Sequence, residues 1–138
     1  MKSPFWNKTL TVYTKYFDEE TKTATWYRYV LTDCFFARTN KARFASPELY
    51  RESENLARIP AQENYVPYAE WCAMSDEERT ANFSVAPEKS IVFLGEIGES
   101  ITDGRGTALR KKYPESFAVG EFRDNTAFAL SHYHAEGT

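Results

Sequence analysis

Hydrophobic and polar positions alternate with period two over residues 8–17, KTLTVYTKYF. This alternation is typical of a β-strand, because successive side chains of a strand point to opposite faces. A polar, turn-like run follows at 18–23, and residues 24–38 are then dense in Trp, Tyr, Val and Phe. Together these segments predict a long antiparallel hairpin near the N-terminus. The second segment is too long for one straight strand, so we expect a bend or bulge near Thr32 and Asp33.

The regular pattern stops at residues 39–55, TNKARFASPELYRESEN, which are polar and charged with no sustained period. We expect a long polar surface loop here. Loops of this length in compact domains are commonly binding elements. The hydrophobic residues of the segment, Phe44, Leu49 and Tyr50, are therefore candidate interface residues.

The rest of the chain predicts short strands separated by two or three short helices. Ser75 and Glu78 form a capping-box pattern, which predicts a helix over 76–82. Further short helices are expected at 67–74 and 108–114, and strands at 56–60, 91–97, 116–125 and 128–137, with a turn at Asp124 and Asn125. Residues 1–138 are thus expected to form a single, mainly β domain, a small β-barrel or sandwich.

The composition is unusually aromatic, at 16% of residues. Aromatic side chains favour strands and supply large contact areas. Trp26, Tyr27 and Tyr29 lie in a strand that is apolar or aromatic on both faces. Such a strand is buried on both sides, either within its own domain or partly against another subunit. These three residues are therefore candidate interface residues as well.

The formal net charge of −3 argues against a dedicated nucleic-acid coat protein, which would normally be basic. One compact basic cluster stands out, formed by Arg105, Arg110, Lys111 and Lys112. It is a candidate contact for DNA or for an acidic protein partner, and the plainer interpretation is a solvated helix face.

The cysteines, Cys34 and Cys72, are far apart. We expect reduced thiols, with one disulfide as the alternative. No signal peptide or membrane-spanning apolar run is present, so the protein is expected to be made in the cytosol and to have no membrane partner.

His132 and His134 are the two histidines of the chain. On a strand they share a face, which is the geometry that two metal ligands need. A metal site would need a third ligand, such as Glu136 on the same face or a distant carboxylate, and the weak two-histidine pattern is better interpreted as strand or interface histidines. Motifs for nucleophilic catalysis are absent as well, and we therefore expect no enzyme activity, no catalytic or metal-binding residues and no cofactor.

Four stretches of the chain resemble the minor capsid, or head-to-tail joining, proteins of tailed bacteriophages and prophages. They are NKTLTVYTKYFDEETKTATWYRYVLTDCFFAR, IPAQENYVPYAEWCAM, FSVAPEKSIVFLGEI and LRKKYPESFAVGEFRDNTAFALSHYHAEG. The chain departs from that pattern at Lys89 and Ser90, where Gly-Asp would be expected, and over 39–55, which has no counterpart.

The resemblance implies a structural virion protein of the phage neck, made in the host cytoplasm and similar to a stopper. It implies a homo-oligomeric ring, six- or twelve-fold, between the portal or adaptor and the tail proteins. Such a ring lines the channel for packaged double-stranded DNA and helps to retain that DNA. The alternative is a small β-barrel module that binds nucleic acid or a protein ligand. A tail-terminator role and a metal-dependent enzyme are less favoured.

Overall fold

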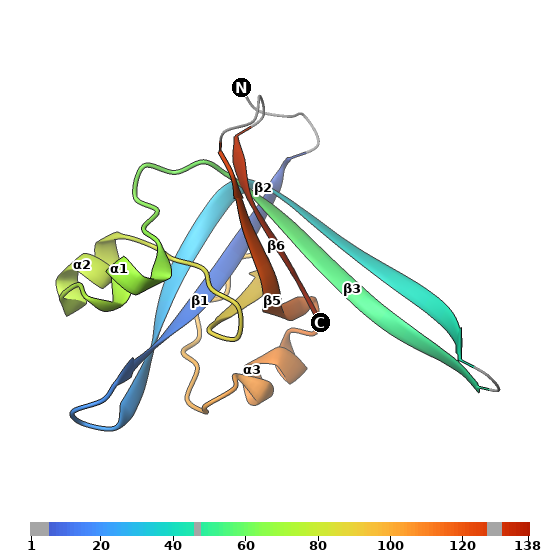
Figure 1. Ribbon diagram of the computed structural model, residues 1–138, viewed down its shortest axis with the longest axis horizontal. Helices are drawn as coiled ribbons and strands as arrows, with labels where there is room; N and C mark the ends of the chain where they lie inside the picture. The colour runs from blue at the N-terminus through green and yellow to red at the C-terminus, as the bar shows by residue number, and fades with distance from the viewer. Residues whose placement is uncertain (1–5, 46–47, 127–130) are drawn as a thin grey trace.

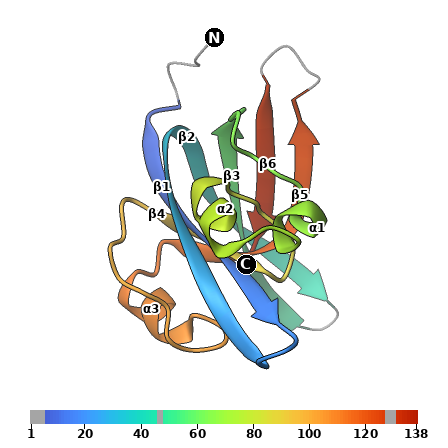
Figure 2. The ribbon, with the colours of Figure 1, turned by 90° about the vertical axis from the view of Figure 1, so that its left-hand side faces the viewer.

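The computed structural model describes residues 6–45, 48–126 and 131–138, with residues 39–45 and 48–54 described by their backbone alone. The elements in chain order are β1 (Lys8–Asp18), β2 (Thr23–Ala45), β3 (Glu48–Pro60), α1 (Tyr68–Cys72), α2 (Asp76–Ala81), β4 (Ser90–Leu94), α3 (Thr107–Lys112), β5 (Ser116–Asn125) and β6 (His132–Gly137). Figures 1 and 2 show them from two sides.

Within the described residues, six antiparallel strands close into a barrel in the order β1-β2-β3-β6-β5-β4. The predicted N-terminal hairpin is confirmed as β1 and β2, with Val12 opposite Tyr29. On its other side, Val12 lies opposite Val92 of β4. The mainly β prediction is confirmed, and of barrel and sandwich the barrel is the one that forms.

The predicted bulge in the second strand is confirmed. Lys8 pairs with Cys34 whereas Leu10 pairs with Leu31, so the register shifts between them. Asp33 lies within this shift with a positive φ of 58°. A bulge bends the strand that carries it. Here it lies where β2 passes from pairing with β1 to pairing with β3.

The prediction of a long polar loop over 39–55 is wrong. β2 continues to Ala45, β3 begins at Glu48, and the two pair continuously from Thr39 opposite Glu54 to Ala45 opposite Glu48. We call residues 39–45 and 48–54 the arm, and it extends well beyond the barrel at the right of Figure 1. Alternation of apolar residues arises where one face of a strand meets a core. The arm extends past the barrel and meets no core there. Its sequence therefore lacks the apolar alternation from which a strand could be predicted.

Two hydrophobic clusters hold the body together. The larger fills the barrel and includes Leu10, Val12, Trp71, Phe117 and Tyr133. The smaller lies on the outer side of β1 and β4, where the chain from Ile97 to Ile101 and Leu109 of α3 cover Tyr13, Ile91 and Phe93. β4 is therefore buried on both faces, as its continuous apolar run predicts. It ends at Leu94 rather than at Ile97, because Gly95 has a φ of 94° and donates its N–H to the carbonyl of Thr9 at 2.7 Å.

The short helices also follow the predicted pattern. The capping box is formed: the Ser75 side chain accepts from the N–H of Glu78, whose carboxylate accepts from the N–H of Ser75. The predicted helix over 67–74 is confirmed as α1, and the one over 108–114 as α3, which begins at Thr107 and ends at Lys112 before Pro114.

The strand predicted over 116–125 is confirmed as β5, and the turn predicted at Asp124 and Asn125 begins only after both residues. β5 includes both Asp124 and Asn125, and the Asp124 carboxylate accepts from the N–H of Thr126 at 3.0 Å. β6 begins at His132. The predicted start of this strand at 128 lies outside the described residues.

Candidate functional site

The base of the arm is fastened to the barrel by a small polar network. Arg38 donates from Nε to Oδ1 of Asn55 at 2.8 Å and from Nη2 to the carbonyl of Pro114 at 3.1 Å. Asn55 is 1% exposed, and its side-chain amide donates to the carbonyl of Gly137 at 3.4 Å. A buried amide with partners on two sides fixes the direction in which the strands leave the barrel. No motif or pattern in the sequence marks either residue as functional.

Beyond this base, the arm is paired only with itself. β3 pairs with β6 from Asn55 to Pro60, and β2 pairs with β1 up to Cys34. Within the described part of the chain, no third strand pairs with the arm, so both of its edges carry backbone groups without a strand partner. The candidate interface residues Phe44, Leu49 and Tyr50 are at arm positions, with Phe44 opposite Leu49. Their side chains lie outside the described residues.

A second two-stranded ribbon leaves the barrel on the opposite side, at the lower left of Figure 1. We call it the tip ribbon, and it consists of residues 15–18 of β1 paired with residues 23–26 of β2. β4 pairs with β1 only as far as Thr14. The ribbon carries Phe17, which is 44% exposed, and its turn begins with the acidic residues Asp18, Glu19 and Glu20.

Tyr27 and Tyr29, two of the candidate interface residues, lie inside the molecule. Both are 8% exposed, and their hydroxyls bind the α1–α2 lobe: Tyr27 donates to Asp76 at 2.6 Å and Tyr29 to the carbonyl of Arg79 at 2.5 Å. The guanidinium of Arg79 lies 3.7 Å from the ring centre of Tyr16. These residues lock the lobe onto the barrel, and burial raises the pKa of Tyr29. Tyr27 and Tyr29 are therefore buried by their own chain, through the α1–α2 lobe.

Trp26, the third aromatic candidate, is half-buried on the outside of the barrel. Its indole N–H donates to the carbonyl of Asp103 at 3.1 Å, and the Lys15 ammonium lies 5.7 Å from its ring centre. Trp26, Lys15, Arg105 and Arg110 line a cavity of about 510 Å³ together with Glu88.

The four cations of the basic cluster differ in their contacts. Arg110 donates to the Ser116 and Thr138 carbonyls at 3.3 and 3.0 Å, and burial lowers its pKa. Lys112 forms an ion pair with Glu99 at 2.7 Å. Arg105 and Lys111 are exposed. Two of the four cations thus serve internal contacts, which reduces the positive charge that the cluster offers to DNA.

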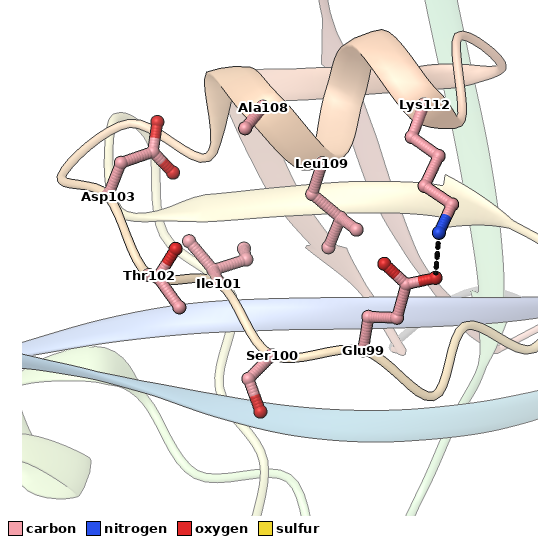
Figure 3. Close-up of a pocket in the computed structure, with 8 residues that line it drawn as sticks. All are labelled: Glu99, Ser100, Ile101, Thr102, Asp103, Ala108, Leu109 and Lys112. Carbon is pink, nitrogen blue, oxygen red and sulfur yellow. Dashed lines mark ion pairs between the residues drawn. The ribbon is translucent and has the colours of Figure 1, made fainter.

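A pocket of about 240 Å³ lies between α3 and the preceding loop (Figure 3). The Glu99 carboxylate on its wall accepts from Lys112 and from the hydroxyl of Tyr113 at 2.7 Å, and these partners lower the pKa of Glu99. Asp103 accepts from the N–H of Thr107 at 2.9 Å. The polar groups of this pocket therefore fasten the loop to α3.

His132 and His134 share the outer face of β6, as predicted, while Tyr133 points into the core. The ring of His132 lies edge-on to Trp6, with 5.5 Å between ring centres, and is 3.2 Å from the amide nitrogen of Asn125. His134 is 8% exposed and lies 2.7 Å from the Glu136 carboxylate. Both imidazoles therefore contact their own chain. No group of three or more metal-ligating side chains is found among the described residues.

The two cysteines are free thiols, as predicted. Burial raises the pKa of Cys34 to about 12. Such a thiol is almost entirely protonated at neutral pH and is a poor nucleophile. None of the helices in the described part of the chain is long and apolar enough to cross a bilayer.

The chain belongs to a family of unknown function, DUF6751, whose model matches residues 5–138. Comparisons with curated proteins and with solved structures gave no match.

Proposed function

We propose that this protein is a structural component of the neck of a tailed bacteriophage, a stopper-like head-to-tail connector. In this role, copies of the chain form a closed ring between the portal or adaptor and the tail. The ring lines the channel through which double-stranded DNA passes and helps to retain the packaged genome. We propose no catalytic activity.

The observation that carries the proposal is the arm, a self-paired ribbon that projects from a closed barrel. A two-stranded ribbon on its own is at best marginally stable in water. Because the arm does not pack on its own barrel, it is suited to packing against a neighbouring subunit. In a closed ring, every copy has such a neighbour.

The charge of the protein is compatible with a DNA channel. The net charge is −3, and Lys112 and Arg110 of the basic cluster are occupied by contacts within the chain. Strong binding to phosphates would hinder the passage of DNA, because each neutralised phosphate adds to affinity. The same facts weigh against the alternative of a nucleic-acid-binding module that uses this cluster.

The proposal is tested by mass spectrometry of purified tailed particles and by light scattering of the purified protein at high concentration. We expect six or twelve copies of the chain in each particle and a six- or twelve-fold oligomer in solution or on the portal. Absence of the chain from the particles would overturn the proposed neck role, and a monomer at every concentration and on the portal would overturn the proposed ring.

A further inference from the structure

The arm and the tip ribbon are two incomplete sheets at opposite sides of one molecule (Figure 1). Beyond its base at Arg38 and Asn55, neither edge of the arm pairs with a strand of the described residues. The tip ribbon has an unpaired edge along Thr23–Trp26 of β2, because β1 lies on one side of these residues and no strand among the described residues lies on the other. Such edges present unpaired N–H and C=O groups that can bind a further strand.

The edge at Thr23–Trp26 is open to solvent. Thr23, Ala24 and Thr25 are exposed, and no proline interrupts the stretch. Further along β2, Tyr27 and Tyr29 bind the α1–α2 lobe, so that part of the strand is engaged with its own chain. The accessible edge is therefore short and lies next to the acidic turn of the tip ribbon.

The charges of the sequence select one edge of the arm. Residues 39–45, the β2 half, contain Lys41 and Arg43 and no acidic residue. Residues 48–54, the β3 half, contain three Glu and one Arg. The turn of the tip ribbon, residues 18–23, contains Asp18, Glu19 and Glu20 and one basic residue, Lys22, and is acidic on balance. Opposite charges favour the β2 half beside this turn, and like charges disfavour the β3 half.

We infer that the β2 half of the arm, residues 39–45, docks edge to edge on Thr23–Trp26 of a second copy of this chain. This places two paired ribbons in one four-stranded sheet that is shared by neighbours. The donor and acceptor surfaces differ and lie at opposite sides of the molecule, so the contact is head-to-tail, and such a contact closes into a ring when the rotation between copies permits. The inference rests on the proposed ring and specifies the contact that builds it.

The first test is a charge swap. Lys41→Glu with Arg43→Glu weakens assembly by about 10- to 100-fold, as expected when like charges are juxtaposed in an interface. Adding Glu19→Lys and Glu20→Lys to the same chain restores assembly to within about threefold, because the charges are again opposite. The matched control is Glu52→Lys with Glu54→Lys on the β3 half, which leaves assembly unchanged. Sedimentation measures the oligomer in each case, and circular dichroism confirms that each variant is folded.

The second test is cross-linking of mixed chains that each carry one added cysteine in a Cys72→Ser background, in which the remaining thiol, Cys34, is buried. Chains with Ala42→Cys are mixed with chains with Thr25→Cys and oxidised. A covalent dimer is expected, because a disulfide requires Cα atoms about 4.4–6.8 Å apart, a distance that directly paired strands provide. The control mixtures replace one partner by Lys111→Cys on α3, or Ala42→Cys by Glu52→Cys, and are expected to yield little dimer.

Failure of the inference is distinct from failure of the proposed function. If the chain is found as a ring in tailed particles but the charge swap does not restore assembly and Ala42 does not cross-link to Thr25, the arm contact is wrong and the neck role stands. If the cysteines at positions 42 and 25 cross-link but the chain is absent from tailed particles, the arm contact is supported and the proposed neck role is wrong.

Discussion

The barrel and the arm are held together by different forces. The barrel buries two hydrophobic clusters, and its strands have sheet neighbours on both sides. The arm is a single pair of strands joined to the barrel through Arg38 and Asn55. Burial of apolar surface is the main source of folding stability, whereas an unsupported ribbon contributes little. The stability of this protein should therefore lie in the barrel, and the arm should be free to serve assembly.

The strongest way to break the barrel is to truncate Trp71. This side chain is fully buried, and its indole N–H lies 3.0 Å from the Tyr29 hydroxyl and 3.1 Å from the Asn82 carbonyl. Trp71→Ala is expected to lower the free energy of unfolding by about 3–5 kcal/mol, because it removes packing and leaves a cavity. Urea denaturation measures the loss. Phe17→Ala on the exposed tip ribbon is the control and should cost less than about 0.5 kcal/mol.

A smaller loss is expected where β6 closes against β5. A Cβ on Gly137 would lie 1.8 Å from the carbonyl oxygen of Ala118, so the backbone has to shift. Gly137→Ala should lower the free energy of unfolding by about 1–3 kcal/mol, the range for overpacking. Gly98→Ala, where a Cβ meets nothing within 4 Å, is the matched control. Equal thermal stability of the two variants would contradict this account of barrel closure.

Raising the pH perturbs the barrel more gently. Burial raises the pKa of Tyr65 to about 12, and it raises the pKa of Tyr13 and Tyr29 as well. A folded-state pKa above that of the unfolded chain means that this contribution to stability is complete below about pH 10 and is lost as the pH rises toward 12. Unfolding midpoints should therefore be insensitive to these tyrosines up to about pH 10 and fall above it. Phenolate absorbance of Tyr65 before unfolding would contradict the assigned burial.

The smallest effect on folding is expected from removal of the arm itself. Joining Arg38 to Asn55 through an Asn-Gly turn deletes residues 39–54 and retains the network at the base. The free energy of unfolding should change by less than about 0.5 kcal/mol, because the barrel pairing is untouched. Assembly, measured by sedimentation, should be lost. A variant that unfolds would show that the arm stabilises the barrel after all.

Local pattern was enough to predict the elements that meet the core. The alternation in 8–17, the apolar run that became β4 and the Ser75–Glu78 capping box all appear in the structure at or near their predicted places. In the strands, burial of one or both faces selects apolar residues at regular positions. In the capping box, local hydrogen bonds select a Ser and a Glu three residues apart. The sequence of the arm predicts a loop, because backbone pairing away from a core leaves no period of apolar residues.

The candidate sites were less predictable than the elements. Two residues of the predicted basic cluster form contacts within the chain, because Lys112 pairs with Glu99 and Arg110 donates to the carbonyl of Thr138. Tyr27 and Tyr29 were candidates for an interface and instead hold the α1–α2 lobe. Arg38 and Asn55, at the base of the arm, could not be predicted as a pair. A single polar residue has the same appearance in the sequence whether it lies in an exposed loop or in a buried hydrogen-bond network.

By itself, the sequence determined the mainly β class, the first hairpin with its bulge at Thr32 and Asp33, and the short helices. These depend on interactions between residues near one another in the chain. Only the tertiary structure decided that β3 pairs with β6 to close a barrel and that residues 39–54 form a projecting arm. Those features depend on contacts between distant segments, and the free energy of such contacts is not encoded in any short stretch of residues.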